Sequence, residues 1–289
     1  MPSRAHALGT ACHVRCRGGA YGCLAYPGTT GADFIDYVIA DEIVLPLDQQ
    51  PFWSEKIVHL PDCYQVNDTK RPIAERTPTR RECGLPERGF VFCSFNNTYK
   101  ITPPLFDIWI GLLHKVEGSV LWLFRDNAAA ERNLRQEAIA RGIDPSRLVF
   151  ADRLKLAEHL ARHRLADLFL DTLPYNAHTT ASDALWVGLP VLTCLGKAFA
   201  ARVAGSLLHA VGLPELVTKS LDEYEALALK LAREPLLLLS YRSRLAKNRS
   251  TAPLFNTERF RQHLERAYHT MLDIKRRGEP PQNFSVARI

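Results

Sequence analysis

From residue 89 onward the chain alternates short apolar runs with longer segments of helical periodicity. Runs such as 90–95 and 119–124 are apolar almost throughout, which is typical of parallel strands buried on both faces. This alternation predicts an α/β fold built around a parallel sheet. The expected strands are residues 90–95, 119–124, 147–150, 167–171 and 190–194, and the expected helices are 103–115, 128–141, 155–163, 179–187, 199–211, 222–233, 236–248 and 257–276.

The first 88 residues lack this regular alternation. Residues 1–23 mix Cys, Arg and Gly without periodicity, and we expect an atypical or disordered start. A turn at 26–31, a short helix at 32–39 and a short strand at 54–60 are expected next. Residues 65–88 are polar and rich in Arg, Thr and Pro, which predicts a linker.

Composition narrows the class of protein. The chain has 289 residues, of which 46% are hydrophobic and 24% charged, which is enough for one large domain or two modest ones. No apolar run approaches the roughly 20 residues that cross a bilayer and no secretory signal is recognisable, so we expect a cytoplasmic protein with no membrane partner. The net charge of +6 favours anionic ligands. Without a basic stripe interleaved with aromatic residues, however, we expect no nucleic-acid partner.

The seven cysteines are odd in number and irregular in spacing, which argues against a disulfide framework. Cys12, His13, Cys16 and Cys23 are close in sequence, so a zinc site is one interpretation. Their spacing fits no standard zinc finger, and free thiols are the better interpretation. We therefore expect no metal and no cofactor.

Polar side chains follow several of the predicted strands, where open parallel sheets bind their ligands. Asn97 and Lys100 follow the strand at 90–95, and a Lys there can reach a phosphate as a compact charge. His159 and Arg162 share a helix face, from which an imidazole can stack on a planar base. Taken alone, an Asx-rich turn and a solvated helix face explain these residues better.

The loop that ends in His178 is a stronger candidate. Thr179 or Thr180 is expected to cap the helix that begins there, and the free N–H groups of a helix start form an anion site. Two hydroxyls and an imidazole beside these N–H groups suit a pyrophosphate. Asp183 follows one turn later and can accept hydrogen bonds from ribose hydroxyls.

A fourth segment, residues 196–202, follows the next strand and either closes over a ligand or forms an ordinary strand–helix turn. The sequence contains no Gly-rich dinucleotide motif, no P-loop, no GxSxG elbow and no HExxH. These missing motifs argue against a dehydrogenase, a nucleoside triphosphatase, a serine hydrolase and a zinc protease.

Together these segments resemble the catalytic region of the protein O-GlcNAc transferases, including the bacterial members and the plant SPINDLY branch. The resemblance covers roughly residues 24–272, and the matching segments occur in the family's order. They are residues 26–32, 95–101, 158–162, 176–180 with Asp183, 200–203 and 253–257.

The resemblance implies a GT-B-type fold: a Rossmann-like C-terminal lobe that binds the donor, a partial N-terminal lobe and C-terminal helices. It implies an inverting, metal-independent glycosyltransferase that moves a sugar, expected to be GlcNAc, from a UDP donor to Ser or Thr hydroxyls of a protein acceptor. Lys100 is implied to be catalytic, because it would contact the diphosphate and stabilise the leaving group. The implied nucleotide-sugar-binding residues are Asn97, Lys100, Leu154, His159, Arg162, His178, Thr179, Thr180 and Asp183.

Within that set, the resemblance implies that His159 stacks on the uracil and that Arg162 binds nearby. It implies that the diphosphate is held by His178, Thr179 and Thr180, and that Asp183 binds the ribose. The sequence departs from the family at Asn97, where Gln is common, and at Leu156, where Lys is common. The expected division is residues 1–23 as an atypical start, 24–88 as a partial N-terminal lobe and linker, 89–252 as the UDP-sugar-binding lobe, 253–276 as a C-terminal helix and 277–289 as a tail.

The family's catalytic region also has an acceptor-side His and TPR repeats upstream, and neither has a counterpart in this sequence. We therefore expect an N-terminally truncated catalytic region. The alternative to an active transferase is a UDP-sugar-binding remnant without turnover, or a chain that needs an upstream TPR-bearing partner.

Overall fold

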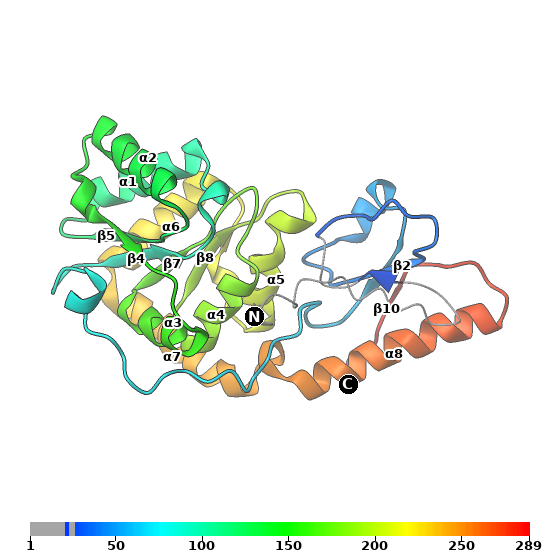
Figure 1. The fold of residues 1–289 in the computed structure, drawn as a ribbon. Coiled ribbons are helices and arrows are strands. Elements are labelled where there is room, and N and C mark those ends of the chain that lie inside the picture. The colour runs from blue at the N-terminus through cyan, green and yellow to red at the C-terminus, as the bar shows by residue number, and fades with distance from the viewer. Residues whose placement is uncertain (1–20, 23–26) are drawn as a thin grey trace, which may run out of the picture.

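The computed structural model describes residues 21–22 and 27–289, which form two lobes, each built on a parallel sheet (Figure 1). The expected atypical start, apart from Tyr21 and Gly22, lies outside the described residues. So do Tyr26 and the cysteine-rich group that suggested a zinc site, namely Cys12, His13, Cys16 and Cys23.

The larger lobe is a six-stranded sheet with helices on both faces. Its elements are β4 (Val91–Ser94), α1 (Pro103–Lys115), β5 (Val120–Phe124), α2 (Ala128–Ala140), β6 (Leu148–Ala151), α3 (Leu156–Arg162), β7 (Leu168–Leu170), α4 (Thr179–Val187), β8 (Val191–Cys194), α5 (Val203–Ala210), β9 (Val217–Thr218), α6 (Leu221–Arg233) and α7 (Pro235–Thr251). The strands run parallel in the order β6-β5-β4-β7-β8-β9. α1 packs against α6 on one face, and α3, α4 and α5 lie side by side on the other (Figure 1). Because both faces are covered, β4, β7 and β8 are buried along their full length.

The smaller lobe combines both ends of the described chain. Its parallel sheet has the order β1-β2-β3-β10, with β1 (Tyr21–Gly22), β2 (Tyr37–Ala40), β3 (Lys56–His59) and β10 (Phe284–Ser285). The long helix α8 (Thr257–Arg276) runs beneath this sheet in Figure 1. Ala267 and Met271 of α8 pack with Tyr37, Ile39 and Val58 of the sheet in a second, small hydrophobic core.

The predicted α/β fold with a parallel sheet is confirmed, and α1, α4 and α8 have the bounds expected from periodicity. The helix expected at 32–39 is wrong, because the chain forms strand β2 there. Tyr37, Val38 and Ile39 are aromatic or β-branched and all buried, which suits a strand inside a sheet. The expected tail at 277–289 contains β10, which pairs with β3.

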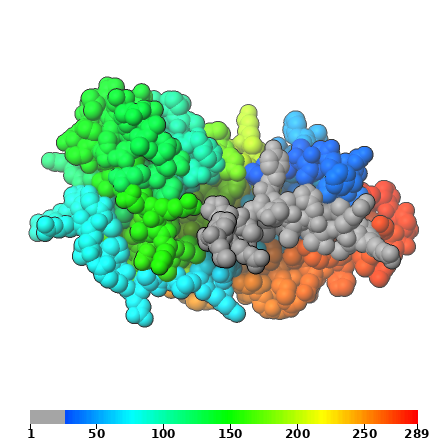
Figure 2. All heavy atoms as spheres, viewed as in Figure 1, coloured from blue at the N-terminus to red at the C-terminus, as the bar shows by residue number. Residues whose placement is uncertain are grey.

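The segment between β3 and β4 crosses from the smaller lobe to the larger one. It contains a single 3-10 turn, Arg81–Cys83, among otherwise irregular backbone, as expected for a linker. Figures 1 and 2 show it, in cyan, running along the surface of the larger lobe. It is fixed there by the backbone bond from Ala74 N–H to Ala157 O (3.0 Å) and by an ion pair between Arg71 and Asp183.

Among the described residues, no helix is both long and apolar enough to span a bilayer.

Candidate active site

The loops that follow β4 and β7 meet at the carboxyl edge of the large sheet. Asn96 donates from Nδ2 to Thr172 Oγ1 (2.8 Å) and accepts a hydrogen bond from Thr180 on α4. Lys100 ends a short 3-10 turn (Thr98–Lys100), and its Nζ donates to Asn176 O at 2.9 Å. The structure therefore brings Lys100 next to the start of α4, although the two are far apart in sequence.

Asp171 holds the loop after β7 in place. This buried carboxylate accepts hydrogen bonds from Thr193 Oγ1 (2.6 Å) and from the backbone N–H groups of Thr172 (2.7 Å) and Ala177 (2.5 Å). Burial raises the pKa of Asp171 to about 7, and these hydrogen bonds and Lys100 oppose that rise. The sequence analysis did not single out Asp171. An acidic side chain at the end of an apolar strand was the pattern that could have indicated it.

Lys100 is a half-buried cation. Burial lowers its pKa to about 8, while the charge of Asp171 acts in the opposite direction. At neutral pH the ammonium is therefore still mostly protonated. It also lies 4.1 Å from the centroid of the Tyr175 ring, an aromatic contact that sequence reasoning did not anticipate.

The start of α4 is built differently from the prediction. Its N-cap is His178, whose side chain makes no capping bond, so the expectation that Thr179 or Thr180 caps the helix is wrong. The Thr180 hydroxyl donates to Asn96 instead, and Thr179 is exposed. The N–H groups of the first turn thus lack a side-chain cap, which leaves the positive end of the helix dipole open to an anion.

His178 lies between α4 and the next loop. Its ring stacks on Tyr175, with centroids 5.0 Å apart and planes inclined by 22°. Its Nε2 lies 3.3 Å from Ala200 O, in the turn between β8 and α5. Burial, reinforced by the charge of Lys100, lowers the pKa of His178 to about 4, so the imidazole is neutral at pH 7.

On α3, Arg162 contacts His159 and is itself only 2% exposed. Its Nη2 lies 2.5 Å from His159 Nδ1, and its Nη1 donates to Asp152 O at 2.6 Å. Because a guanidinium only donates, Nδ1 is the acceptor and the ring proton sits on Nε2. Burial, with the nearby charges of His163 and Arg162, holds the pKa of His159 far below its usual value. Arg162 thus fixes the orientation and tautomer of the His159 ring through Nδ1.

Two of the remaining predicted residues are open to solvent and one is covered. Asn97 is exposed after β4, and Leu154, 43% exposed, precedes α3. Asp183, on α4, is 5% exposed and paired with Arg71 from the linker. Burial raises the pKa of Asp183 to about 6, and Arg71 opposes the rise. The carboxylate expected to bind ribose already has a partner.

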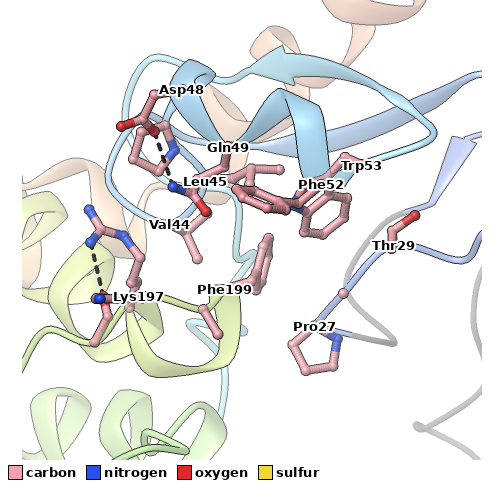
Figure 3. Close-up of a pocket in the computed structure, with 15 residues that line it drawn as sticks. Pro27, Thr29, Val44, Leu45, Asp48, Gln49, Phe52, Trp53, Lys197 and Phe199 are labelled. Atoms are coloured by element: carbon pink, nitrogen blue, oxygen red, sulfur yellow. Dashed lines mark hydrogen bonds between the residues drawn. The ribbon is translucent and has the colours of Figure 1, made fainter.

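A cavity of about 640 Å³ lies where the two lobes meet (Figure 3). Its walls come from residues 27–29 and 44–53 of the smaller lobe and from 196–202 of the larger lobe, the fourth segment singled out in the sequence. None of the predicted donor-site residues lines it. The two regions are nevertheless joined, because Ala200 O in the cavity-side turn accepts a hydrogen bond from Asn176 N–H (2.8 Å).

The fold defines the class of protein first. The solved structure of WaaG, a glycosyltransferase involved in lipopolysaccharide biosynthesis, superposes with a TM-score of 0.56 at 17% identity, covering 80% of this chain and 62% of WaaG. The expected GT-B-type architecture is confirmed. Within that class, the chain belongs to glycosyl transferase family 41, whose family model matches residues 21–77 and 72–264.

Relatives within this family confirm the resemblance seen in the sequence. The chain is 42% identical over 269 residues to the probable UDP-N-acetylglucosamine–peptide N-acetylglucosaminyltransferase SEC of Arabidopsis thaliana, covering 91% of this chain and 28% of that protein. The corresponding enzyme of Caenorhabditis elegans is 40% identical, covering 65% of this chain and 16% of its own length. A mutant O-GlcNAc transferase of Thermobaculum terrenum superposes with a TM-score of 0.80 at 29% identity, over 89% of this chain and 49% of that one. The chain thus spans less than a third of the length of these two curated relatives.

Proposed function

We propose that this chain transfers N-acetylglucosamine from UDP-GlcNAc to Ser or Thr hydroxyls of a protein acceptor, with inversion and without a metal. The observation that carries the proposal is the convergence of Lys100, the neutral His178 and the uncapped start of α4. The relatives whose names specify UDP-N-acetylglucosamine and a peptide acceptor support the choice of substrates. A cytoplasmic location belongs to the same proposal, with no membrane or nucleic-acid partner.

The chemistry follows from charge. When the sugar leaves UDP, negative charge grows on the diphosphate, and Lys100 with the α4 N–H groups is placed to stabilise it. An anion there would raise the lowered pKa of Lys100 and keep the ammonium charged. We assign the uracil to His159, held by Arg162, with Leu154 beside it, and the diphosphate also to Thr179 and Thr180.

A second candidate is a UDP-sugar-binding protein without turnover, or one that turns over only with a TPR-bearing partner chain. The Arg71–Asp183 pair bears on both candidates, because the carboxylate assigned to the ribose is already engaged. In either case, Arg71 has to release Asp183 or share it with the nucleotide.

Replacing Lys100 separates these candidates. If the chain is an active transferase, the purified protein forms free or peptide-linked GlcNAc from UDP-GlcNAc, which mass spectrometry detects. Lys100→Ala should then lower the rate by about a hundredfold or more. The matched control is Lys247→Ala, an exposed lysine on α7 near the far end of α4, which should leave the rate unchanged.

Thermal unfolding gives the second readout. UDP at 100 times its Kd should stabilise the protein by about 2.7 kcal/mol. Stabilisation without product formation supports the binding protein, and no stabilisation at any concentration rejects both candidates. Full activity of Lys100→Ala would refute the role of Lys100.

A further inference from the structure

A series of side-chain contacts joins three loops at the carboxyl edge of the large sheet. The Lys100 ammonium lies over the face of Tyr175, with Nζ 4.1 Å from the ring centroid. The Tyr175 ring stacks on His178, with centroids 5.0 Å apart and planes inclined by 22°. His178 Nε2 in turn lies 3.3 Å from Ala200 O, a carbonyl that can only accept a hydrogen bond. The series links the loops after β4, β7 and β8, and Tyr175 stands in its middle.

The ammonium of Lys100 has few fixed contacts of its own. A lysine carries its charge on a flexible four-carbon stem, and the Lys100 Nζ donates one hydrogen bond, to Asn176 O at 2.9 Å. An aromatic face attracts an ammonium through its quadrupole and needs no lone pair. The Tyr175 ring therefore restrains the ammonium from a second direction. The remaining N–H donors of Lys100 stay available to a diphosphate.

Tyr175 is itself held in place on the loop after β7. Its carbonyl oxygen accepts a hydrogen bond from Thr172 Oγ1 at 2.7 Å, and Thr172 Oγ1 accepts one from Asn96 Nδ2 at 2.8 Å. Thr172 and Asn96 are both buried, which strengthens these hydrogen bonds. With its backbone bonded and its ring stacked, Tyr175 forms a preorganised support for Lys100.

The charge of Lys100 also depends on its surroundings. Burial lowers the pKa of Lys100 to about 8, and Asp171, whose own pKa is about 7, acts in the opposite direction. His178, with a pKa lowered to about 4, is neutral at pH 7 and adds no charge. Attraction to the Tyr175 ring favours the charged ammonium. Loss of the ring should therefore lower the pKa of Lys100 further and also release its position.

We propose that Tyr175 is a positioning residue of the transferase, whose ring holds the Lys100 ammonium and the His178 imidazole where they meet the diphosphate. The inference rests on the proposed function, because Tyr175 acts through Lys100. If the side chain contacted the donor directly, its loss would raise KM and leave the titration of Lys100 unchanged. If it only filled space, neither the titration nor the need for an aromatic ring would follow.

Two substitutions separate the aromatic face from the rest of the side chain. Turnover of UDP-GlcNAc is measured across neutral and alkaline pH. In wild type, kcat/KM should fall as the pH rises through about 8, because Lys100 loses its proton. Tyr175→Leu should lower kcat at pH 7 about three- to tenfold with KM within about twofold, and move the alkaline limb down by about half a pH unit. Tyr175→Phe keeps the ring and should restore most of both.

Tyr241→Leu is the matched control. Tyr241 is also half-buried and also lies under a cation, with Arg244 Cζ 5.3 Å from its ring centroid, but it belongs to α7. Its replacement should change neither the rate nor the pH profile. Melting temperatures of the two Leu variants are compared, and Tyr175→Met, with a more adaptable side chain, replaces Tyr175→Leu if the latter does not fold.

The outcomes distinguish this inference from the transferase itself. If wild type turns over UDP-GlcNAc and Tyr175→Leu keeps its kcat, or loses rate with the alkaline limb unmoved, the positioning role is refuted and the transferase stands. An increase in KM alone refutes it as well and places Tyr175 against the donor. If wild type forms no product, the transferase fails and the positioning role with it.

Discussion

Arg162 is placed to serve the proposed nucleotide site through His159 rather than through the nucleotide itself. At 2% exposure it offers almost no surface to a ligand, but its guanidinium donates to Nδ1 of His159. It also packs over Phe95, with Cζ 5.0 Å from the ring centroid. The sequence placed His159 and Arg162 on one helix face, whereas their contact and its direction required the structure.

Arg162→Met should therefore impair UDP binding through His159. Met keeps much of the volume and removes the donor to Nδ1, and we expect the Kd for UDP, measured by calorimetry, to rise about five- to tenfold, as for loss of about 1 kcal/mol. Imidazole ¹⁵N spectra should show unprotonated Nδ1 in wild type and a mixture of tautomers in the variant. Arg132→Met, an exposed arginine on α2, is the control.

An unchanged His159 spectrum together with weaker UDP binding would count against the positioning role. It would instead favour direct contact between Arg162 and the nucleotide.

Side-chain positions were predictable where a residue follows a strand, whereas hydrogen-bond and ion-pair partners from distant parts of the chain were not. Lys100 and His178 lie at the carboxyl edge of the sheet because parallel strands end there together. The partners of Asp183 and Thr180 come from the linker and from the loop after β4, and no local pattern announces them. The N-cap of α4 was predicted wrongly for this reason, because the Thr180 hydroxyl donates to Asn96 from the loop after β4.

At the scale of elements, periodicity predicted the helices and the apolar strands of the larger sheet well, but it missed β2, β9 and β10. α1, α4 and α8 have the expected bounds, because their apolar faces repeat over two or more turns. β10 has two residues and pairs with a strand more than 200 positions earlier, so its sequence carries no usable period. β2 was mistaken for a helix because its flanking apolar residues suit either spacing.

The pairing of β10 predicts that the chain end stabilises the smaller lobe. Val286 is 8% exposed, belongs to the small core and donates its N–H to His59 O at 2.9 Å. Val286→Asp buries an unpaired carboxylate and should lower the free energy of unfolding by about 3 kcal/mol. Ile289→Asp, at a 42% exposed position near the same end, should change it by less than about 0.5 kcal/mol. Equal effects in urea denaturation would mean that β10 does not stabilise the lobe.

At the scale of the whole molecule, the cleft exists because the two lobes are joined by buried polar contacts. Asp41, at the end of β2, accepts a hydrogen bond from Ser206 Oγ on α5 (2.5 Å) and others from the backbone N–H groups of Val44 (2.8 Å) and Tyr64 (2.9 Å). Arg202 adds its bond to Ile43 O. The GT-B-type division was predictable from family resemblance, but the residues that join the lobes were not, because each pair spans most of the chain.

Ser206→Ala tests whether this junction preserves the cleft. The change removes one side-chain link between the lobes and leaves the buried carboxylate of Asp41 with one donor fewer, which should cost about 1–3 kcal/mol of stability. At this chain length that corresponds to a fall in Tm of about 2–4 °C per kcal/mol. Ser250→Ala, whose exposed hydroxyl bonds only within α7, should leave Tm nearly unchanged. Because the proposed diphosphate site lies within the larger lobe and the cavity needs both lobes, Ser206→Ala should also weaken peptide transfer more than UDP binding. A variant with wild-type Tm and undiminished transfer would show that the lobes keep their arrangement without this contact.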